Sequence, residues 1–255
     1  YNGLQLTGRK RYSNGVELLA AYTLSKTLSD NLGYSGSGGV AGMSAYWQNA
    51  YDRRADYGPA FFDARHNFNL AGLVELPFGR QRRFATDLHP VVDAVIGGWQ
   101  LGYNWNIHSG FPITINSPNN SNSGARAARA NRYRELVIEN QSIDNWFGTD
   151  PSARPCPANQ DNGVCAYGQQ WSGAFGTAGV STERAPHYNN IDLTVNKRFP
   201  IAERKYFELR GEFFNAFNMV SFGPPERATN SAQFGAITTQ INPARNVQLA
   251  LKFFF

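Results

Sequence analysis

The chain has 255 residues, of which 42% are hydrophobic, 14% aromatic and only 17% charged, and its formal net charge is +5. This composition is too apolar for a disordered chain, and no apolar run approaches the length of about 18 residues that a membrane helix needs. The basic residues are scattered apart from GRQRR at 79–83, and no nucleic-acid motif accompanies them, so a nucleic-acid partner is not expected. If the chain crosses a membrane, it must do so as a β-barrel.

Seven segments alternate apolar and polar residues with the period of a half-buried strand. In chain order they cover residues 2–12, 16–28, 66–76, 97–115, 189–199, 206–217 and 245–255. Each is roughly ten residues or longer, which is enough for a tilted strand to cross a bilayer. Between the third and fourth segments, HPVVDAVIGG predicts one or two helical turns, with Pro90 near the start and Gly97 past the end.

The fourth segment shows the alternation most clearly. One face carries Trp99, Leu101, Tyr103, Trp105 and Ile107, and the other carries Gln100, Gly102, Asn104, Asn106 and His108. We interpret the aromatic face as facing lipid and the polar face as facing a watery lumen. On the sixth segment the column Glu208, Arg210 and Glu212 also suits a lumen, because a cation on the lipid face costs about 2–4 kcal/mol at the bilayer midplane. The alternative is a large soluble barrel or sandwich with an aromatic core.

The connections alternate between short and long. Short connections fall at 13–15 and 200–205, an intermediate one at 79–97, and long ones at 30–65, 116–188 and 218–244. Outer-membrane barrels have short periplasmic turns and long extracellular loops, whereas long structureless loops argue against a compact soluble domain. The expected fold is therefore all-β, with antiparallel transmembrane strands. Because seven strands are fewer than the smallest barrels contain, we expect a carboxyl-terminal part of a larger barrel.

Six stretches, in this order along the chain, resemble the TonB-dependent outer-membrane receptors, specifically their Oar-like branch. They are AAYTLSKTLSD, NAYDRRADYGPAFFDARHNFNLAGLVELPFG, GGWQLGYNWNIHSGFPITI, HYNNIDLTVNKRFPI, ELRGEFFNAFNMVSFGPP and FGAITTQINPARNVQLALKFFF. The resemblance covers nearly the whole chain. It implies a bacterial outer-membrane barrel of 22 strands plugged by an amino-terminal domain, with cargo bound by extracellular loops and imported with energy from the inner membrane. Residues 1–255 would be the carboxyl-terminal barrel segment, without the plug domain.

The resemblance also implies partners. These are outer-membrane lipid and lipopolysaccharide, the TonB energy complex acting through upstream parts, the barrel-assembly machinery, and an unidentified small-molecule, peptide or saccharide cargo. The assembly machinery reads a terminal strand pattern that Gln248, Ala250, Phe253 and Phe255 match, with Ala250 where glycine is commonest. The alternative function is a structural or secretion-related surface protein without uptake activity, since a barrel fold does not fix function.

For recognition, we expect the long loops to use aromatic contacts from Tyr46, Trp47, Tyr51, Trp146, Phe147 and Trp171. Cys156 and Cys165 lie in a Pro-, Asn- and Gly-rich stretch, which favours a local disulfide. Metal binding is the alternative, although two thiols with no nearby histidine make a poor zinc site. The four histidines are dispersed, and no nucleophile elbow, phosphate loop or calcium-loop spacing is recognisable. Neither a cofactor nor enzymatic activity is expected.

Overall fold

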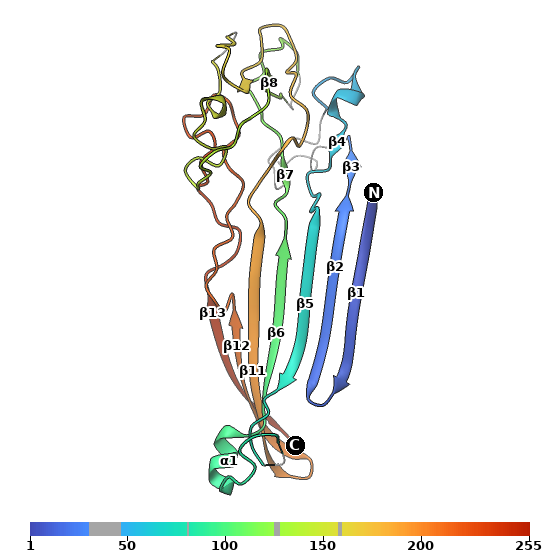
Figure 1. The fold of residues 1–255 in the computed structure, drawn as a ribbon, viewed down its shortest axis with the longest axis vertical. Helices are drawn as coiled ribbons and strands as arrows, with labels where there is room; N and C mark the ends of the chain where they lie inside the picture. The colour runs from blue at the N-terminus through green and yellow to red at the C-terminus, as the bar shows by residue number, and fades with distance from the viewer. Residues whose placement is uncertain (31–46, 81, 125–127, 158–159) are drawn as a thin grey trace.

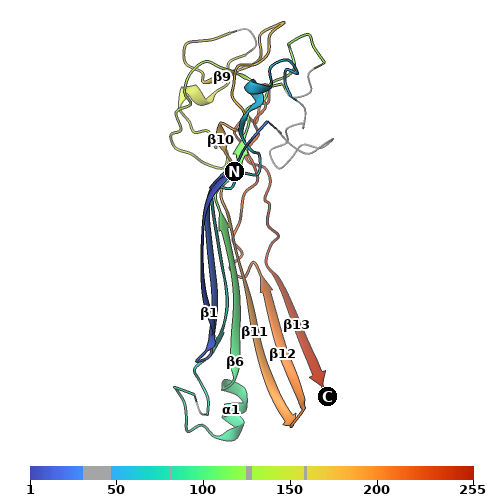
Figure 2. The same cartoon turned by 90° about the vertical axis from the view of Figure 1, so that its right-hand side faces the viewer.

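A computed structural model describes residues 1–30, 47–80, 82–124, 128–157 and 160–255. The chain forms one antiparallel sheet of seven long strands, each paired with the next long strand along the chain. The strands are β1 (Asn2–Ser13), β2 (Val16–Lys26), β5 (His66–Glu75), β6 (Trp99–His108), β11 (Tyr188–Ala202), β12 (Lys205–Phe214) and β13 (Asn246–Phe254). Short connections gather at one end of this tall sheet and long loops at the other (Figures 1 and 2). We call the sheet the wall.

Short helices and two-residue strands lie at the two ends of the wall. Helix α1 (Pro90–Ile96) lies at the end with the short connections (Figure 1). The long loops contain the 3-10 helices η1 (Arg53–Asp56) and η2 (Pro151–Ala153) and three two-residue ladders. The ladders pair β3 (Leu28–Ser29) with β4 (Gly58–Pro59), β7 (Pro112–Ile113) with β10 (Glu183–Arg184), and β8 (Asn131–Arg132) with β9 (Tyr167–Gly168). Within the described ranges, every helix is too short or too polar to span a membrane.

The structure confirms all seven strands and the helix. Three segments stop two residues or more before their expected ends, whereas β11 runs on to Ala202, so that the connection expected at 200–205 shortens to 203–204. The segment expected at 97–115 breaks after His108, where Gly110 passes so close to Ala185 that a side chain would collide with its carbonyl, and it resumes as β7. The segment expected at 206–217 stops at Phe214 because Asn215 takes a left-handed φ of 47°. The segment expected at 16–28 stops at Lys26, after which β3 pairs with β4 instead of the wall.

The strand register aligns the alternating pattern across the whole wall. One row of neighbouring residues runs through Val16, Val74, Leu101, Val195, Gly211 and Leu249. A row on the opposite face runs through Glu75, Gln100, Asn196, Arg210 and Ala250. A one-residue slip between any two strands would mix these faces. The wall therefore has one apolar face and one polar face, as the alternation predicts.

The protein core lies outside the wall. The cluster of buried hydrophobic residues consists of Phe61, Ile113, Ile115, Ala130, Phe147, Ala153, Ala166, Tyr167 and Ala178. All of them belong to the long loops, whereas the apolar face of the wall stays open, with Leu249 77% exposed on β13. In the described residues, β1 and β13 each pair with a single long strand and form the two free edges of the sheet.

Candidate functional site: the loop head

Three long connections join the wall strands at 27–65, 109–187 and 215–245. Their described residues fold together into one body, which we call the loop head (Figures 1 and 2). Its described part contains the hydrophobic cluster and most of the buried polar side chains. Loops that carry recognition are usually held in place by a rigid scaffold. The loop head is therefore the candidate binding region.

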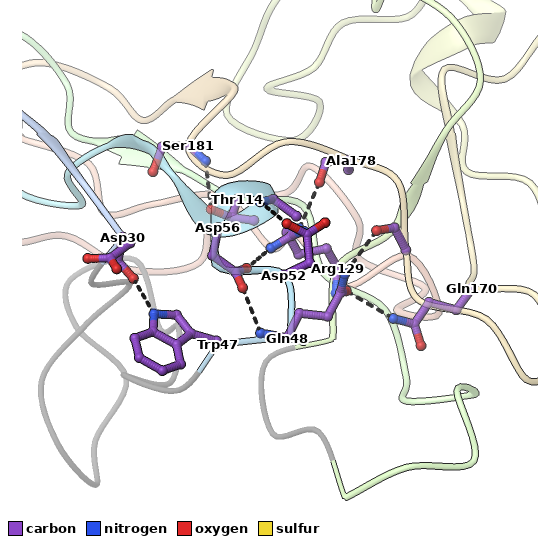
Figure 3. A network of polar contacts seen from close by, with 12 residues as sticks. Asp30, Trp47, Gln48, Asp52, Asp56, Thr114, Arg129, Gln170, Ala178 and Ser181 are labelled. Carbon is purple, nitrogen blue, oxygen red and sulfur yellow. Dashed lines mark hydrogen bonds and ion pairs between the residues drawn. The ribbon is translucent and has the colours of Figure 1, made fainter. Parts of the chain in front are cut away.

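A buried ion pair joins the first loop to the second. The Arg129 guanidinium donates to the Asp56 carboxylate, and these side chains are 2% and 0% exposed. Arg129 Nε also donates to the Ala178 carbonyl at 2.7 Å, while the Asp56 carboxylate accepts from the Gln48 backbone N–H at 3.1 Å (Figure 3). The two charges thus have several hydrogen-bond partners, which a buried pair requires.

Gln48 extends this network further into the second loop. Its side-chain oxygen accepts from the backbone N–H of Arg129 at 2.8 Å and from the Gln170 side chain at 3.2 Å. Its side-chain nitrogen donates to the Gly176 carbonyl at 2.9 Å. Figure 3 shows Gln48, Asp56, Arg129 and Gln170 converging from separate stretches of the chain. We call these four residues the clasp.

The charge on Arg129 persists despite its burial. Desolvation lowers the pKa of Arg129 to about 10, and the nearby Asp52 carboxylate opposes this shift. A group with that pKa remains protonated at neutral pH, so Asp56 faces a full positive charge. Removing either partner would leave the other charge buried and unpaired.

A second ion pair lies at the base of the loop head, next to the ends of the wall strands. The Arg184 guanidinium donates to the Asp63 carboxylate at 2.9 Å and to the Gly110 carbonyl at 3.0 Å. The Asp63 carboxylate also accepts from the backbone N–H of Thr27 at 2.7 Å. These contacts connect the chain leaving β2 with the chain leaving β6 and the chain entering β11. Charged hydrogen bonds therefore hold these chains together at the base of the loop head.

The second and third loops are joined by backbone hydrogen bonds and ring packing. Asn116 donates to the Arg227 carbonyl at 3.2 Å, and Trp146 donates to the Gly235 carbonyl at 2.8 Å. The rings of Phe147 and Phe234 pack with centroids 5.0 Å apart. All three loops thus interlock, although they leave the wall from different strands.

Cys156 and Cys165 form a disulfide within the second loop. Both sulfurs lie beside Asp161, and in the described residues this is the group of side chains with metal-like spacing. Sulfurs bonded to each other are not thiolate ligands, and Asp161 instead accepts two hydrogen bonds from Arg134, at 2.8 and 3.0 Å. The arrangement is therefore a cross-linked loop.

The aromatic residues expected to touch cargo divide into two groups. Tyr51 is fully exposed, Trp171 is 46% exposed and Trp47 is 36% exposed. Trp47 and Trp171 directly adjoin the clasp residues Gln48 and Gln170 in sequence, and Trp47 Nε1 donates to the Asp30 carbonyl at 3.0 Å. Phe147 lies in the core at 2% exposure, and the half-buried Trp146 donates to the Arg184 carbonyl at 2.7 Å. Tyr46 lies outside the described residues.

A pocket of about 370 Å³ opens between the second and third loops. The Phe147 and Phe234 rings line it together with polar side chains from both loops, among them Asn145, Thr149, Asp150 and Ser231. Hydrogen bonds from the Ser152 side chain and from its backbone N–H, the latter at 2.8 Å, lower the pKa of the Asp150 carboxyl. The size and mixed lining suit a small polar ligand with an apolar part.

Sequence reasoning missed the polar residues that hold the loop head together. Gln48, Asp56, Arg129 and Gln170 lie 8 to 122 residues apart in sequence, so no local spacing connects them. The signal present in the sequence is DRRAD at 52–56, a charged segment that either binds a ligand or, as is more common, is solvated or internally paired. The structure shows that its last residue, Asp56, pairs internally with Arg129.

The apolar outer face, the polar inner face and the sorting of loops by length together define a transmembrane β-barrel wall. Comparison with known families agrees: the model of the outer membrane beta barrel domain matches residues 1–248. The chain therefore belongs to the outer membrane beta barrel domain family, and its location is the bacterial outer membrane. No curated protein and no solved structure gives a significant match.

Proposed function

We propose that this chain is the wall and recognition head of a TonB-dependent receptor of the Oar-like branch, which binds cargo outside the cell and imports it with energy from the inner membrane. The observation that carries the proposal is the clasp, which joins two long loops through four side chains, two of which form a buried ion pair. Such preorganisation lowers the entropy cost of binding. The head is proposed to act as a receptor and not as an enzyme, without a cofactor.

The exposed aromatic side chains and the pocket describe the cargo surface. Trp47, Tyr51 and Trp171 are exposed to solvent, and the Arg53 guanidinium lies 4.3 Å from the Trp47 ring centroid. The pocket between the second and third loops also offers polar groups and the side chains of two phenylalanines to a ligand. Rings and polar groups together suit a small molecule, a peptide or a saccharide, whereas the scattered basic residues do not favour a nucleic acid.

The wall is proposed to be the carboxyl-terminal segment of a 22-strand barrel that surrounds a separate plug domain. The free edges of β1 and β13 support this proposal, because unpaired edges are aggregation-prone unless another strand covers them. The TonB complex would act through the plug. The apolar face of the wall would contact outer-membrane lipid, and the outer rim would contact lipopolysaccharide.

The last strand is proposed as the signal for the barrel-assembly machinery. Phe253 lies opposite Phe207 on the apolar face, and its ring packs 5.8 Å from that of Phe255. Gln248 and Ala250 lie opposite Glu212 and Arg210 on the polar face. The residues of the signal thus occupy both faces of a strand whose outer edge is free in the described residues.

Uptake by cells that carry the full-length protein tests the transport proposal. Cells with and without the protein are given labelled ferric siderophores, cobalamin, oligosaccharides and peptides, with and without a protonophore that removes inner-membrane energy. We expect one class to accumulate only in energised cells that carry the protein. Binding that never leads to accumulation would instead support the structural or secretion-related alternative.

Substitutions then test the recognition surface. Replacing Trp47, Tyr51 and Trp171 together by alanine should weaken binding of that cargo at least tenfold, because exposed aromatic residues dominate most interfaces. The matched control replaces Tyr57 and Phe62, which are similarly exposed aromatic residues of the first loop. Equal losses in the two variants, or none in either, would contradict the assignment of the surface without affecting the uptake result.

A further inference from the structure

Helix α1 turns its aliphatic side outward. Val91, Val92, Val95 and Ile96 share one side of the helix and are 67%, 40%, 66% and 45% exposed. The acidic Asp93 instead turns toward the protein, where its carboxylate accepts from the Arg80 backbone N–H at 2.7 Å. A helix facing water normally has the opposite arrangement. The exposed aliphatic side of α1 is therefore expected to contact an apolar environment and not water.

The carboxyl end of α1 is fastened to the apolar face of the wall. Trp99 Nε1 donates to the Val95 carbonyl at 2.8 Å, and the Lys197 ammonium donates to the Gly97 carbonyl. Lys197 and Trp99 are direct neighbours in the register and alternate in phase with Leu101 and Val195. They thus belong to the lipid-facing side of β6 and β11. Helix α1 lies at the lower end of the wall (Figures 1 and 2). Because its carboxyl end contacts lipid-facing side chains, we infer that its aliphatic side continues the lipid-facing surface.

The segment before α1 adds rings and positive charge. Phe78 and Phe84 are about half exposed and pack with centroids 5.9 Å apart, and the Arg83 guanidinium lies 5.5 Å from the Phe84 ring. Residues 77–98 contain three arginines and two aspartates, which gives a net charge of 3 − 2 = +1. Aliphatic and aromatic side chains flanked by arginine match the boundary between acyl chains and phosphate headgroups.

We propose that α1, with Phe78 and Phe84, is an interfacial anchor that lies in the periplasmic leaflet of the outer membrane and contacts phospholipid. Short turns mark this end of the wall as periplasmic, and continuity with the lipid-facing surface makes lipid the occupant. The anchor would fix the depth of β5 and β6, because the segment 77–98 joins these strands. The proposal requires the outer-membrane location but not transport.

Spin labelling of the full-length protein in isolated outer membranes tests the anchor. A nitroxide on V95C is compared with a nitroxide on E203C, which lies in the exposed turn between β11 and β12 at the same end of the wall. The readout is the collision rate with oxygen, which concentrates in lipid, relative to that with a water-soluble nickel chelate. We expect a several-fold higher oxygen-to-nickel ratio at position 95 than at position 203.

Each other outcome overturns the proposal. Equal ratios at the two positions would place α1 in water, and low collision rates with both reagents at position 95 would mean that a protein covers it. A second label at V91C should give the same result as V95C, because both side chains are about two-thirds exposed and their replacement disturbs little packing. Agreement between these two sites keeps the test valid if one variant assembles poorly.

Discussion

The wall and the loop head bury opposite kinds of side chain. In the described part of the wall, the side chains that become buried are polar, namely Asn190, Lys197 and Glu208, while the apolar side chains stay open. In the loop head the apolar residues gather inside, as in a soluble domain. The difference shows that the wall depends on lipid for its apolar contacts, whereas the head carries a core of its own. The two regions should therefore respond differently to substitution.

The largest effect should follow from removing one charge of the clasp. Arg129→Met leaves the Asp56 carboxylate buried without its counter-ion, which we expect to destabilise the loop head by about 3–5 kcal/mol. Hydrogen exchange should show faster exchange in the head, with unchanged protection in the wall. Arg53→Met is the matched control, because its ion pair with Asp30 is largely exposed to solvent and should contribute little to stability. Similar losses in both variants would show that burial does not set the strength of the clasp.

The second-largest effect should follow from placing a charge on the face of the wall that contacts lipid. Leu101→Arg places a cation among the apolar neighbours Val74 and Val195 and should cost about 2–4 kcal/mol. Asn104→Arg is the control, since Asn104 is exposed on the polar face and lies opposite Asp192. The measurement is the fraction of protein that reaches the outer membrane and resists unfolding by heat in detergent. Equal tolerance of both substitutions would overturn the assignment of the faces.

A smaller and local effect should follow from opening the disulfide. Replacing Cys156 and Cys165 by serine removes a cross-link that spans nine positions in sequence. The loss of unfolded-state constraint corresponds to about 2–3 kcal/mol. Limited proteolysis should detect new cleavage in the second loop, while the assembled fraction of the wall stays unchanged. A drop in assembly would mean that the loop head and the wall fold as one unit.

The sequence predicts the two regions to different extents because their contacts differ in range. Alternation within β6 depends on neighbouring residues, so the pattern of Trp99, Leu101 and Tyr103 identifies the strand directly. The clasp depends on Arg129 meeting Asp56, 73 residues away, and no periodicity connects them. Phe147 illustrates the same limit: its sequence shows an aromatic residue in a loop, but only the fold shows that Phe234 packs against it. Exposure in a folded loop cannot be read from residue type.

The smallest expected effect is a loss of stability at acidic pH, which should again be confined to the loop head and leave the wall unchanged. Hydrogen bonds from Arg134, together with one from the Gly163 backbone N–H, lower the pKa of Asp161 below its usual value. Since the pKa is lower in the folded state, the carboxylate stabilises the head above the unfolded value of about 3.9, and this contribution is lost as the pH falls through the folded value.

Proteolysis of the second loop between about pH 5 and about pH 2.5 should therefore show a small loss of protection in the native protein that Asp161→Asn lacks. Arg134→Met should abolish the same difference, because Arg134 is the main source of the shift. The effect should be slight, since the Arg134–Asp161 pair is partly exposed to solvent. If Asp161→Asn kept the full acid response, other carboxylates would control it, and the local contribution of this pair to the head would be refuted.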